Sequence, residues 1–181
     1  IDTGVSSDLA KSIEVQILKV DGVRAMHQLR TRKMGSEILA DVHIHVGPRI
    51  SVSEGHRIGD AVTEQLEERT PSLRDVIVHI DPEDDDQQQP SIDLPLRPKI
   101  EGGVKVAFQN LRNTGLITLA DSPSNIVLHY LEGKLSLEIW IPLTNQSSTV
   151  LAREIAAMVA KELEQSTCPT EVTVLFAPRS V

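Results

Sequence analysis

Apolar residues in the first 82 positions switch between helical and strand-like spacing. A helical stripe runs from Ser7 to the Asp21-Gly22 stop, and residues 51–70 carry a second stripe at four-residue steps. Alternating apolar and polar residues predict strands over residues 26–32, 37–46 and 76–80. The predicted order is therefore helix, strand, strand, helix, strand, with a hairpin between the first two strands.

The same order returns in the second half of the chain. Helices are expected over residues 101–112 and 149–165, with strands over residues 117–130, 134–143 and 172–176. Apolar positions of the second helix recur 97 residues later, where Ile58, Val62 and Leu66 are matched by Ile155, Val159 and Leu163. We interpret the chain as a tandem duplication of a small α/β (α+β) sandwich.

The duplication predicts two domains and a linker. The first domain covers residues 1–82 and the second, which lacks the metal ligands of the first, covers residues 99–181. Residues 83–98 are acidic and rich in proline, with few apolar side chains, which is typical of a spacer. The acidic run at its start is interpreted as part of this spacer and not as a metal site.

Charge and cysteine content exclude several classes of protein. The net charge of -8 argues against binding nucleic acid phosphates, which needs clustered Lys and Arg. A single cysteine, Cys168, excludes an internal disulfide and a cysteine-rich zinc finger, so a cytosolic setting is expected. No apolar run approaches the roughly 20 residues that span a bilayer.

Histidines are concentrated in the first copy, and strand periodicity predicts where they point. On the second strand Asp41, His43 and His45 should share the face opposite the apolar side chains. On the last strand of this copy His79 and Asp81 should lie on the same outer face. Both strands thus present imidazoles away from the helix-covered core.

Two further histidines complete the candidate ligands. His56 falls on the polar side of the second helix, and His27 lies near the start of the first strand, where its direction is left open. Imidazole nitrogen with carboxylate oxygen is a ligand set for zinc and its divalent neighbours, and the absence of thiolate disfavours copper(I) and iron-sulfur clusters. Taken singly, each histidine could equally be an ordinary surface residue.

The second copy serves as an internal comparison. Aligned along the sequence, the positions of His43, His56, His79 and Asp81 become Ile141, Arg153 or Ala152, Leu175 and Ala177. The scaffold therefore does not need histidines there. A zinc enzyme would need a general base, for which only Glu54 or Asp60 is available, and no HExxH motif supports one. We expect that the protein is not an enzyme.

Residues 22–82 resemble the C-terminal cytoplasmic domain of cation diffusion facilitators. The resemblance is carried by the segments GVRAMHQLRTRKMG, ADVHIHVGPRISVSEGHRIGDAVTEQLE and DVIVHIDPE. It implies a metallochaperone-like (ferredoxin-like) αββαβ fold that pairs across a twofold axis and binds zinc near that interface. By position, the ligands it implies are His27, His43, His56, His79 and Asp81, with His45 at best auxiliary.

The resemblance also implies a role in transport. The piece would be the regulatory part of a homodimeric exporter of zinc or of cadmium, manganese, iron, cobalt or nickel, driven by proton antiport. The transport site would lie in an attached N-terminal membrane domain, with this piece on the cytoplasmic side of the cell (inner) membrane. The alternatives are a structural dimerisation module with vestigial histidines and a soluble zinc enzyme. The metal, the number of ions and the role of the second copy stay open.

Overall fold

Helix α1 (Ser7–Ile17) opens the first unit and is capped by Ser6, whose hydroxyl accepts a hydrogen bond from the Leu9 backbone N–H. The structure is a computed structural model that describes residues 5–84, 91–165 and 170–178. It divides into two units, Ile1–Gln88 and Gln89–Val181. Cys168, the first residues of the chain and residues 85–90 of the expected spacer lie outside the described residues.

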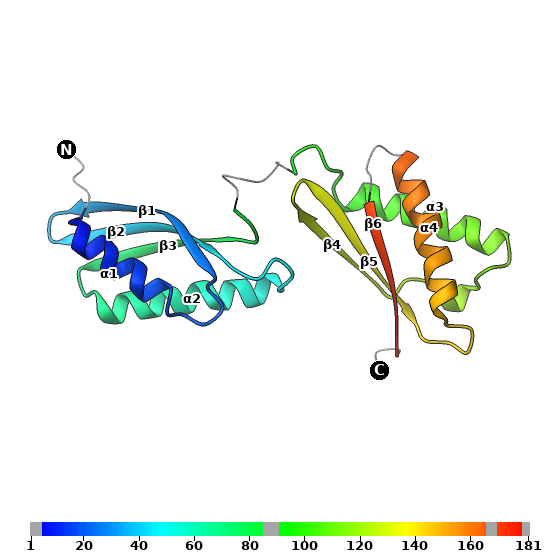
Figure 1. Ribbon diagram of the computed structural model, residues 1–181, viewed down its shortest axis with the longest axis horizontal. Coiled ribbons are helices and arrows are strands. Elements are labelled where there is room, and N and C mark those ends of the chain that lie inside the picture. The colour runs from blue at the N-terminus through cyan, green and yellow to red at the C-terminus, as the bar shows by residue number, and fades with distance from the viewer. Residues whose placement is uncertain (1–4, 85–90, 166–169, 179–181) are drawn as a thin grey trace. The chain divides into compact units, whose positions relative to one another are not determined.

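The remaining elements of the first unit follow in the predicted order. They are β1 (Ala25–Met34), β2 (Glu37–His45), α2 (Val52–Arg69) and β3 (Leu73–Asp81) (Figure 1). Ser51 caps α2 through a hydrogen bond from the Glu54 backbone N–H to its side chain, which fixes the start of this helix where the sequence indicates it. The αββαβ order expected for the first copy is confirmed.

The three strands form one sheet with β2 in the centre. β1 pairs with β2 antiparallel, and β3 pairs with β2 parallel. Both helices contribute to the core on one face of this sheet, because Ile13, Ile17, Val62 and Leu66 cluster there with Val42 and Ile44. The opposite face of the sheet carries the candidate ligands.

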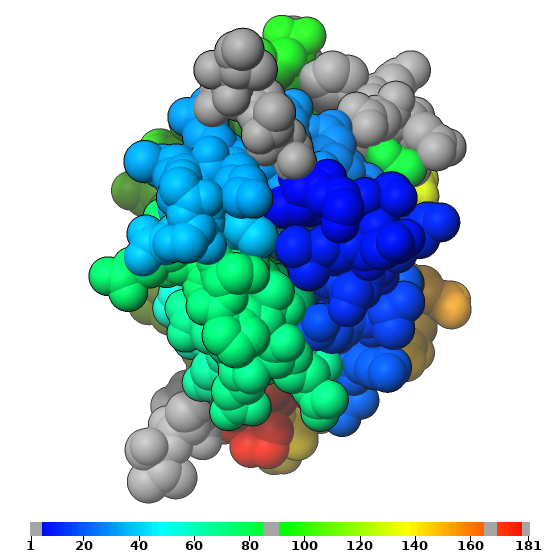
Figure 2. All heavy atoms as spheres, turned by 90° about the vertical axis from the view of Figure 1, so that its left-hand side faces the viewer, coloured from blue at the N-terminus to red at the C-terminus, as the bar shows by residue number. Residues whose placement is uncertain are grey.

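Side-chain contacts join the two helices of this unit. The Gln65 amide donates to the Gln16 backbone carbonyl at 3.1 Å, which ties α2 to the end of α1. Figure 2 shows the first unit from the left-hand side of Figure 1. In this view α1 (deep blue), the end of α2 (green) and the β1–β2 hairpin (light blue) lie against one another.

The second unit repeats the order of elements. It contains α3 (Arg97–Asn113), the short 3-10 helix η1 (Leu119–Asp121), β4 (Asn125–Leu131), β5 (Lys134–Pro142), α4 (Thr149–Gln165) and β6 (Thr170–Ala177). Its sheet also has the central strand antiparallel to one neighbour and parallel to the other. A separate core, built around Phe108, Leu137, Ile139 and Ile155, fills this unit.

Two boundaries of the second unit differ from the sequence prediction. Helix α3 begins at Arg97, ahead of the expected start at residue 101, because Pro98 fits the first helical turn, where no backbone donor is needed. Strand β4 begins at Asn125 and not at residue 117. The preceding segment is held as a turn instead, because Asp121 accepts hydrogen bonds from both the backbone and the hydroxyl of Thr118.

Residues 5–84, 91–165 and 170–178 contain helices of 11 to 18 residues and one short 3-10 helix. No helix in these ranges combines the length and apolar character that crossing a bilayer requires.

Candidate metal centre

Strand β2 supplies the central row of the candidate site. Its side chains alternate as predicted, with Val42 and Ile44 fully buried in the core and Asp41, His43 and His45 half-buried on the other face. The expectation from period-2 spacing is confirmed. The central strand thus contributes one carboxylate and two imidazoles to the uncovered face of the sheet.

Strand β3 adds ligands in register with β2. The parallel pairing sets His43 beside His79 and His45 beside Asp81. Side chains at paired positions point to the same face, so these four residues form a compact block. Sequence periodicity alone predicts their face, and the strand register supplies their adjacency.

Strand β1 brings His27 to the same face. It pairs with His43 across the antiparallel ladder, but the register then shifts, so that the next pair is Arg30 with Asp41. The shift is a β-bulge, which places one extra residue on β1 and re-aims the side chains around it. The direction of His27, which the sequence left open, is therefore outward.

The candidate ligands fall into two groups of three. One group is His27, His45 and Asp81, and the other is Asp41, His43 and His79. Within each group, one ligand atom from every residue lies within 4.8 Å of the others. Nitrogen and oxygen ligands at this spacing are the set that zinc and similar divalent ions use.

Direct contacts join side chains within each group and between the two groups. The His43 Nδ1 lies 2.8 Å from the Asp81 Oδ2, and the His79 Nε2 lies 3.0 Å from the Asp41 Oδ1. His27 Nε2 is farther from Asp81 Oδ2, at 3.8 Å. The rings of His43 and His79 stack, with centroids 4.3 Å apart and an interplanar angle of 13°. The Asp81 carboxylate thus lies between imidazoles of both groups.

Several polar atoms of this cluster are buried without a hydrogen bond. Among the described residues, His27 Nδ1 and His45 Nε2 have no hydrogen-bond partner, and Asp41 Oδ1 faces His79 without hydrogen-bond geometry. Buried polar groups in proteins are nearly always satisfied, so an exception needs an explanation. A bound cation would supply it, because it coordinates the same lone pairs. The donor atoms present fit a divalent metal ion.

The remaining candidate, His56, is not part of either group. Its side chain is 77% exposed and lies 3.9 Å from Asp60, one helical turn further along α2. The structure therefore brings His27, His43, His79 and Asp81 together and leaves His56 apart. His45 and Asp41, which the family pattern does not include, take places in the groups, and strand alternation was the signal that marked them.

The second unit carries different side chains on the corresponding face. Its strand register pairs Trp140 with Leu175 as His43 pairs with His79, and Pro142 with Ala177 as His45 pairs with Asp81. Trp140 thus matches His43, which corrects the alignment of Ile141 with His43; Ile141 is fully buried in the core. Both ligand groups found among the described residues lie in the first unit.

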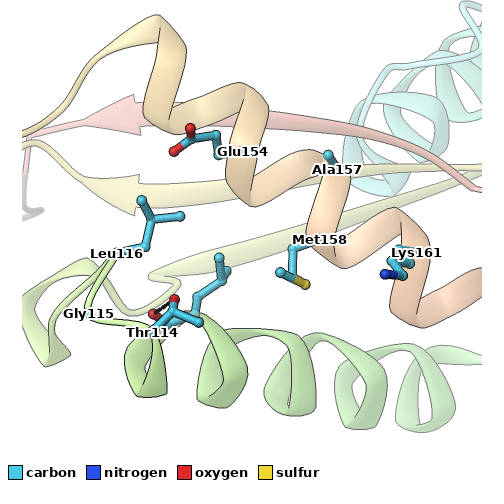
Figure 3. A pocket seen from close by; sticks show the side chains of 8 residues that line it. Thr114, Gly115, Leu116, Glu154, Ala157, Met158 and Lys161 are labelled. Carbon is cyan, nitrogen blue, oxygen red and sulfur yellow. Dashed lines mark hydrogen bonds between the residues drawn. The ribbon is translucent and has the colours of Figure 1, made fainter.

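A hollow of about 580 Å³ in the second unit has a different character. It lies between the end of α3, the turn that follows it and α4 (Figure 3), and its lining residues are Leu111, Thr114, Gly115, Leu116, Glu154, Ala157, Met158 and Lys161. In Figure 3 the Met158 side chain points from α4 toward α3. The charged residues among them are Glu154 and Lys161, and no histidine is present, so the lining offers no set of metal ligands.

The first unit is similar to known proteins. Residues 5–83 match the family model described as "Cation efflux protein, cytoplasmic domain". Metal tolerance protein 2 of Oryza sativa subsp. japonica is 41% identical over 80 residues, which cover 44% of this chain and 21% of that protein. The cation-efflux pump FieF of Pectobacterium atrosepticum is 28% identical over 82 residues, or 45% of this chain and 27% of the pump. The chain thus spans about a quarter or less of these relatives.

Solved structures give a partial match of the same extent. The MamM CTD in a manganese form is 30% identical, and the match covers 41% of this chain and 94% of that one with a TM-score of 0.40. A MamM CTD in a nickel form matches at 25% identity and a TM-score of 0.42, covering 44% of this chain and all of that one.

Proposed function

Since residues 5–83 match the family model of a cation efflux protein cytoplasmic domain, we propose that this unit binds divalent metal ions on the outer face of its sheet and thereby regulates an exporter. The observation that carries the proposal is the pair of three-residue groups, His27, His45 and Asp81 with Asp41, His43 and His79. Six nitrogen and oxygen ligands on one sheet face exceed what a single tetrahedral ion needs. The unit would hold two ions side by side.

Zinc is the ion that the ligand chemistry favours first. Its structural and catalytic sites use His nitrogen and carboxylate oxygen in tetrahedral arrangements. Cadmium, manganese, iron, cobalt and nickel are the other candidates, because imidazole and carboxylate accept several first-row and related divalent ions. Three protein ligands leave a position of each tetrahedral ion for water or for a ligand from another chain.

We assign that further ligand to His56 of a second copy. His56 is exposed and belongs to neither group in its own chain, so its imidazole is accessible to a partner. A ligand supplied by a partner would make metal binding and pairing mutually dependent. Metal would then shift the population toward the homodimer by its higher affinity for the paired state.

Pairing would act on transport through the membrane domain that we place N-terminal to this unit. That domain would carry the exported ion and the proton antiport, on the model of cation diffusion facilitators. The named relatives are a metal tolerance protein and an efflux pump, in agreement with a role other than catalysis. This unit would then lie on the cytoplasmic side of the membrane and act as sensor.

A purely structural dimerisation module with vestigial histidines is the competing explanation. It gives no reason for His27 Nδ1 and His45 Nε2 to be buried without partners, since an unsatisfied buried polar atom costs about 1–3 kcal/mol. Metal coordination gives that reason.

Calorimetric titration of zinc into the full chain tests the proposal. We expect the wild type to bind with a measurable heat, and a double variant, His43→Ala with His79→Ala, to lose the part of it that comes from the ion held by Asp41, His43 and His79. His129→Ala is the matched control, because His129 lies on a strand of the second unit and contacts Glu138. Equal binding by the double variant and the wild type would contradict the proposed site.

A further inference from the structure

One residue of β1 has a backbone conformation that strands do not use. Gln28 has a φ of 52°, in the left-handed region that residues other than glycine rarely occupy. The other non-glycine residue with positive φ among those described is Glu132. Glu132 lies with Gly133 in the two-residue turn between β4 and β5, where hairpin geometry requires this conformation. No turn accounts for Gln28.

Gln28 lies at the β-bulge of the first sheet. His27 pairs with His43 and Arg30 pairs with Asp41, so Gln28 and Leu29 on β1 stand opposite the one intervening residue of β2, Val42. Bulges of this kind commonly contain a residue in the left-handed conformation, which is usually glycine. Here glutamine takes that place.

The bulge resolves a conflict between two neighbours on β1. In a regular strand, residues two positions apart share a face, so His27 and Leu29 would point to the same side. Leu29 packs against the hydrophobic core of the first unit, whereas His27 is grouped with His45 and Asp81 on the opposite face. The extra residue allows both placements at once.

Building on the proposed function, we propose that Gln28 is a positioning residue whose left-handed conformation turns His27 onto the metal-binding face. His27 is held there by its neighbours on β2, with ring centroids 5.1 Å from His43 and 4.6 Å from His45. Metal affinity at the His27, His45 and Asp81 group would therefore depend on a residue that is not itself a ligand.

Substitutions at Gln28 separate its backbone role from its side chain. Gln28→Gly adopts the left-handed conformation freely and should bind zinc within about twofold of wild type. Gln28→Val carries a β-branched side chain that opposes positive φ, and should weaken binding by about tenfold or more, the range found when residues that support metal ligands are lost. Lys33→Val, at an exposed position of the same strand, is the matched control.

Two further measurements show whether Gln28 acts through His27. In the metal-free full chain, the NMR contact between the rings of His27 and His45 should persist in Gln28→Gly and disappear in Gln28→Val. In a His27→Ala background, Gln28→Val should cause no additional loss of zinc affinity, because the interaction is already absent. If the valine variant does not fold, Gln28→Thr replaces it with the same expected losses, because threonine is also β-branched and opposes positive φ while its hydroxyl suits this exposed position.

The outcomes distinguish this inference from the function on which it rests. A folded Gln28→Val that keeps both wild-type zinc affinity and the His27–His45 ring contact overturns the positioning role. A further loss in the His27→Ala background does so too. If wild-type chain binds no zinc, the proposed function fails, and the metal-free ring contact still decides where Gln28 places His27.

Discussion

At the scale of residues, the candidate site is defined by polar atoms buried without partners. His27 Nδ1 and His45 Nε2 are out of contact with solvent and without a hydrogen bond to described residues. Leaving such an atom unsatisfied costs about 1–3 kcal/mol each in folding free energy. Coordination of an ion by these imidazoles would recover this cost.

Removing His45 should test the ligand set that the structure defines. His45→Ala takes one imidazole from the group with His27 and Asp81, so we expect zinc affinity to fall by about tenfold or more in calorimetry. His56→Ala should instead leave zinc binding by the unpaired chain within about twofold of wild type, measured at a concentration too low for pairing. The reverse ranking would favour the ligands implied by the family pattern.

The residue-level prediction from sequence was limited by the bulge and by reliance on the family pattern. Alternation on β2 correctly placed His43 and His45 on one face, because nothing interrupts that strand. It could not orient His27, since the bulge next to this residue breaks the two-residue period. His43 and His79 lie side by side because of the register between β2 and β3. The sequence of a single strand does not determine this register.

At the scale of elements, the strained residue of β1 has a measurable consequence for stability. A non-glycine residue in the left-handed conformation costs about 1–2 kcal/mol, while glycine loses about 0.5–1 kcal/mol through its greater freedom in the unfolded chain. Gln28→Gly should therefore stabilise the first unit by up to about 1 kcal/mol. Urea denaturation of the metal-free chain measures the change. A clear loss of stability would contradict a strained Gln28.

The boundaries of helices and strands were predictable where a capping side chain marks them. Ser51 marks the start of α2 in the sequence, and its hydroxyl caps the helix as expected. The start of β4 was not predictable from apolar residues alone, because Thr118 and Asp121 form a local capping box that holds the chain in a turn. Helix α3 likewise begins at Arg97, with Pro98 in its first turn, in a stretch whose composition indicated a spacer.

At the scale of the whole molecule, the chain contains two units with separate cores. Leu66 belongs to the first core and Ile139 to the second. The repeated αββαβ order and the matching strand registers are consistent with a tandem duplication, which stays a prediction. If the cores are energetically independent, damage to one should leave the other unchanged.

Core substitutions test that independence. Leu66→Ala removes a fully buried side chain and should destabilise the first unit by about 2–5 kcal/mol, with the unfolding of the second unit unaffected. Ile139→Ala should give the opposite pattern. Calorimetric unfolding of the full chain, resolved into two transitions, checks both. A single transition that shifts equally in both variants would show that the units unfold together.

Zinc should stabilise only the first unit, because both ligand groups found among the described residues lie there. At a free zinc concentration of about 100 times the dissociation constant, linkage predicts about 2.7 kcal/mol of added stability for each ion bound. The unfolding temperature of the first unit should rise, and that of the second unit should stay unchanged. A rise confined to the unfolding temperature of the second unit would show that zinc binds there and not to the first unit.

Metal binding by the first unit is proposed to bring two copies of the chain together. Sedimentation velocity of the full chain measures this pairing. We expect zinc to shift the wild type toward a dimer and to shift the variant carrying both His43→Ala and His79→Ala clearly less, with His129→Ala behaving as wild type. Zinc-driven pairing would be contradicted if the sedimentation of the wild type did not respond to zinc. It would also be contradicted if the double variant responded as fully as the wild type.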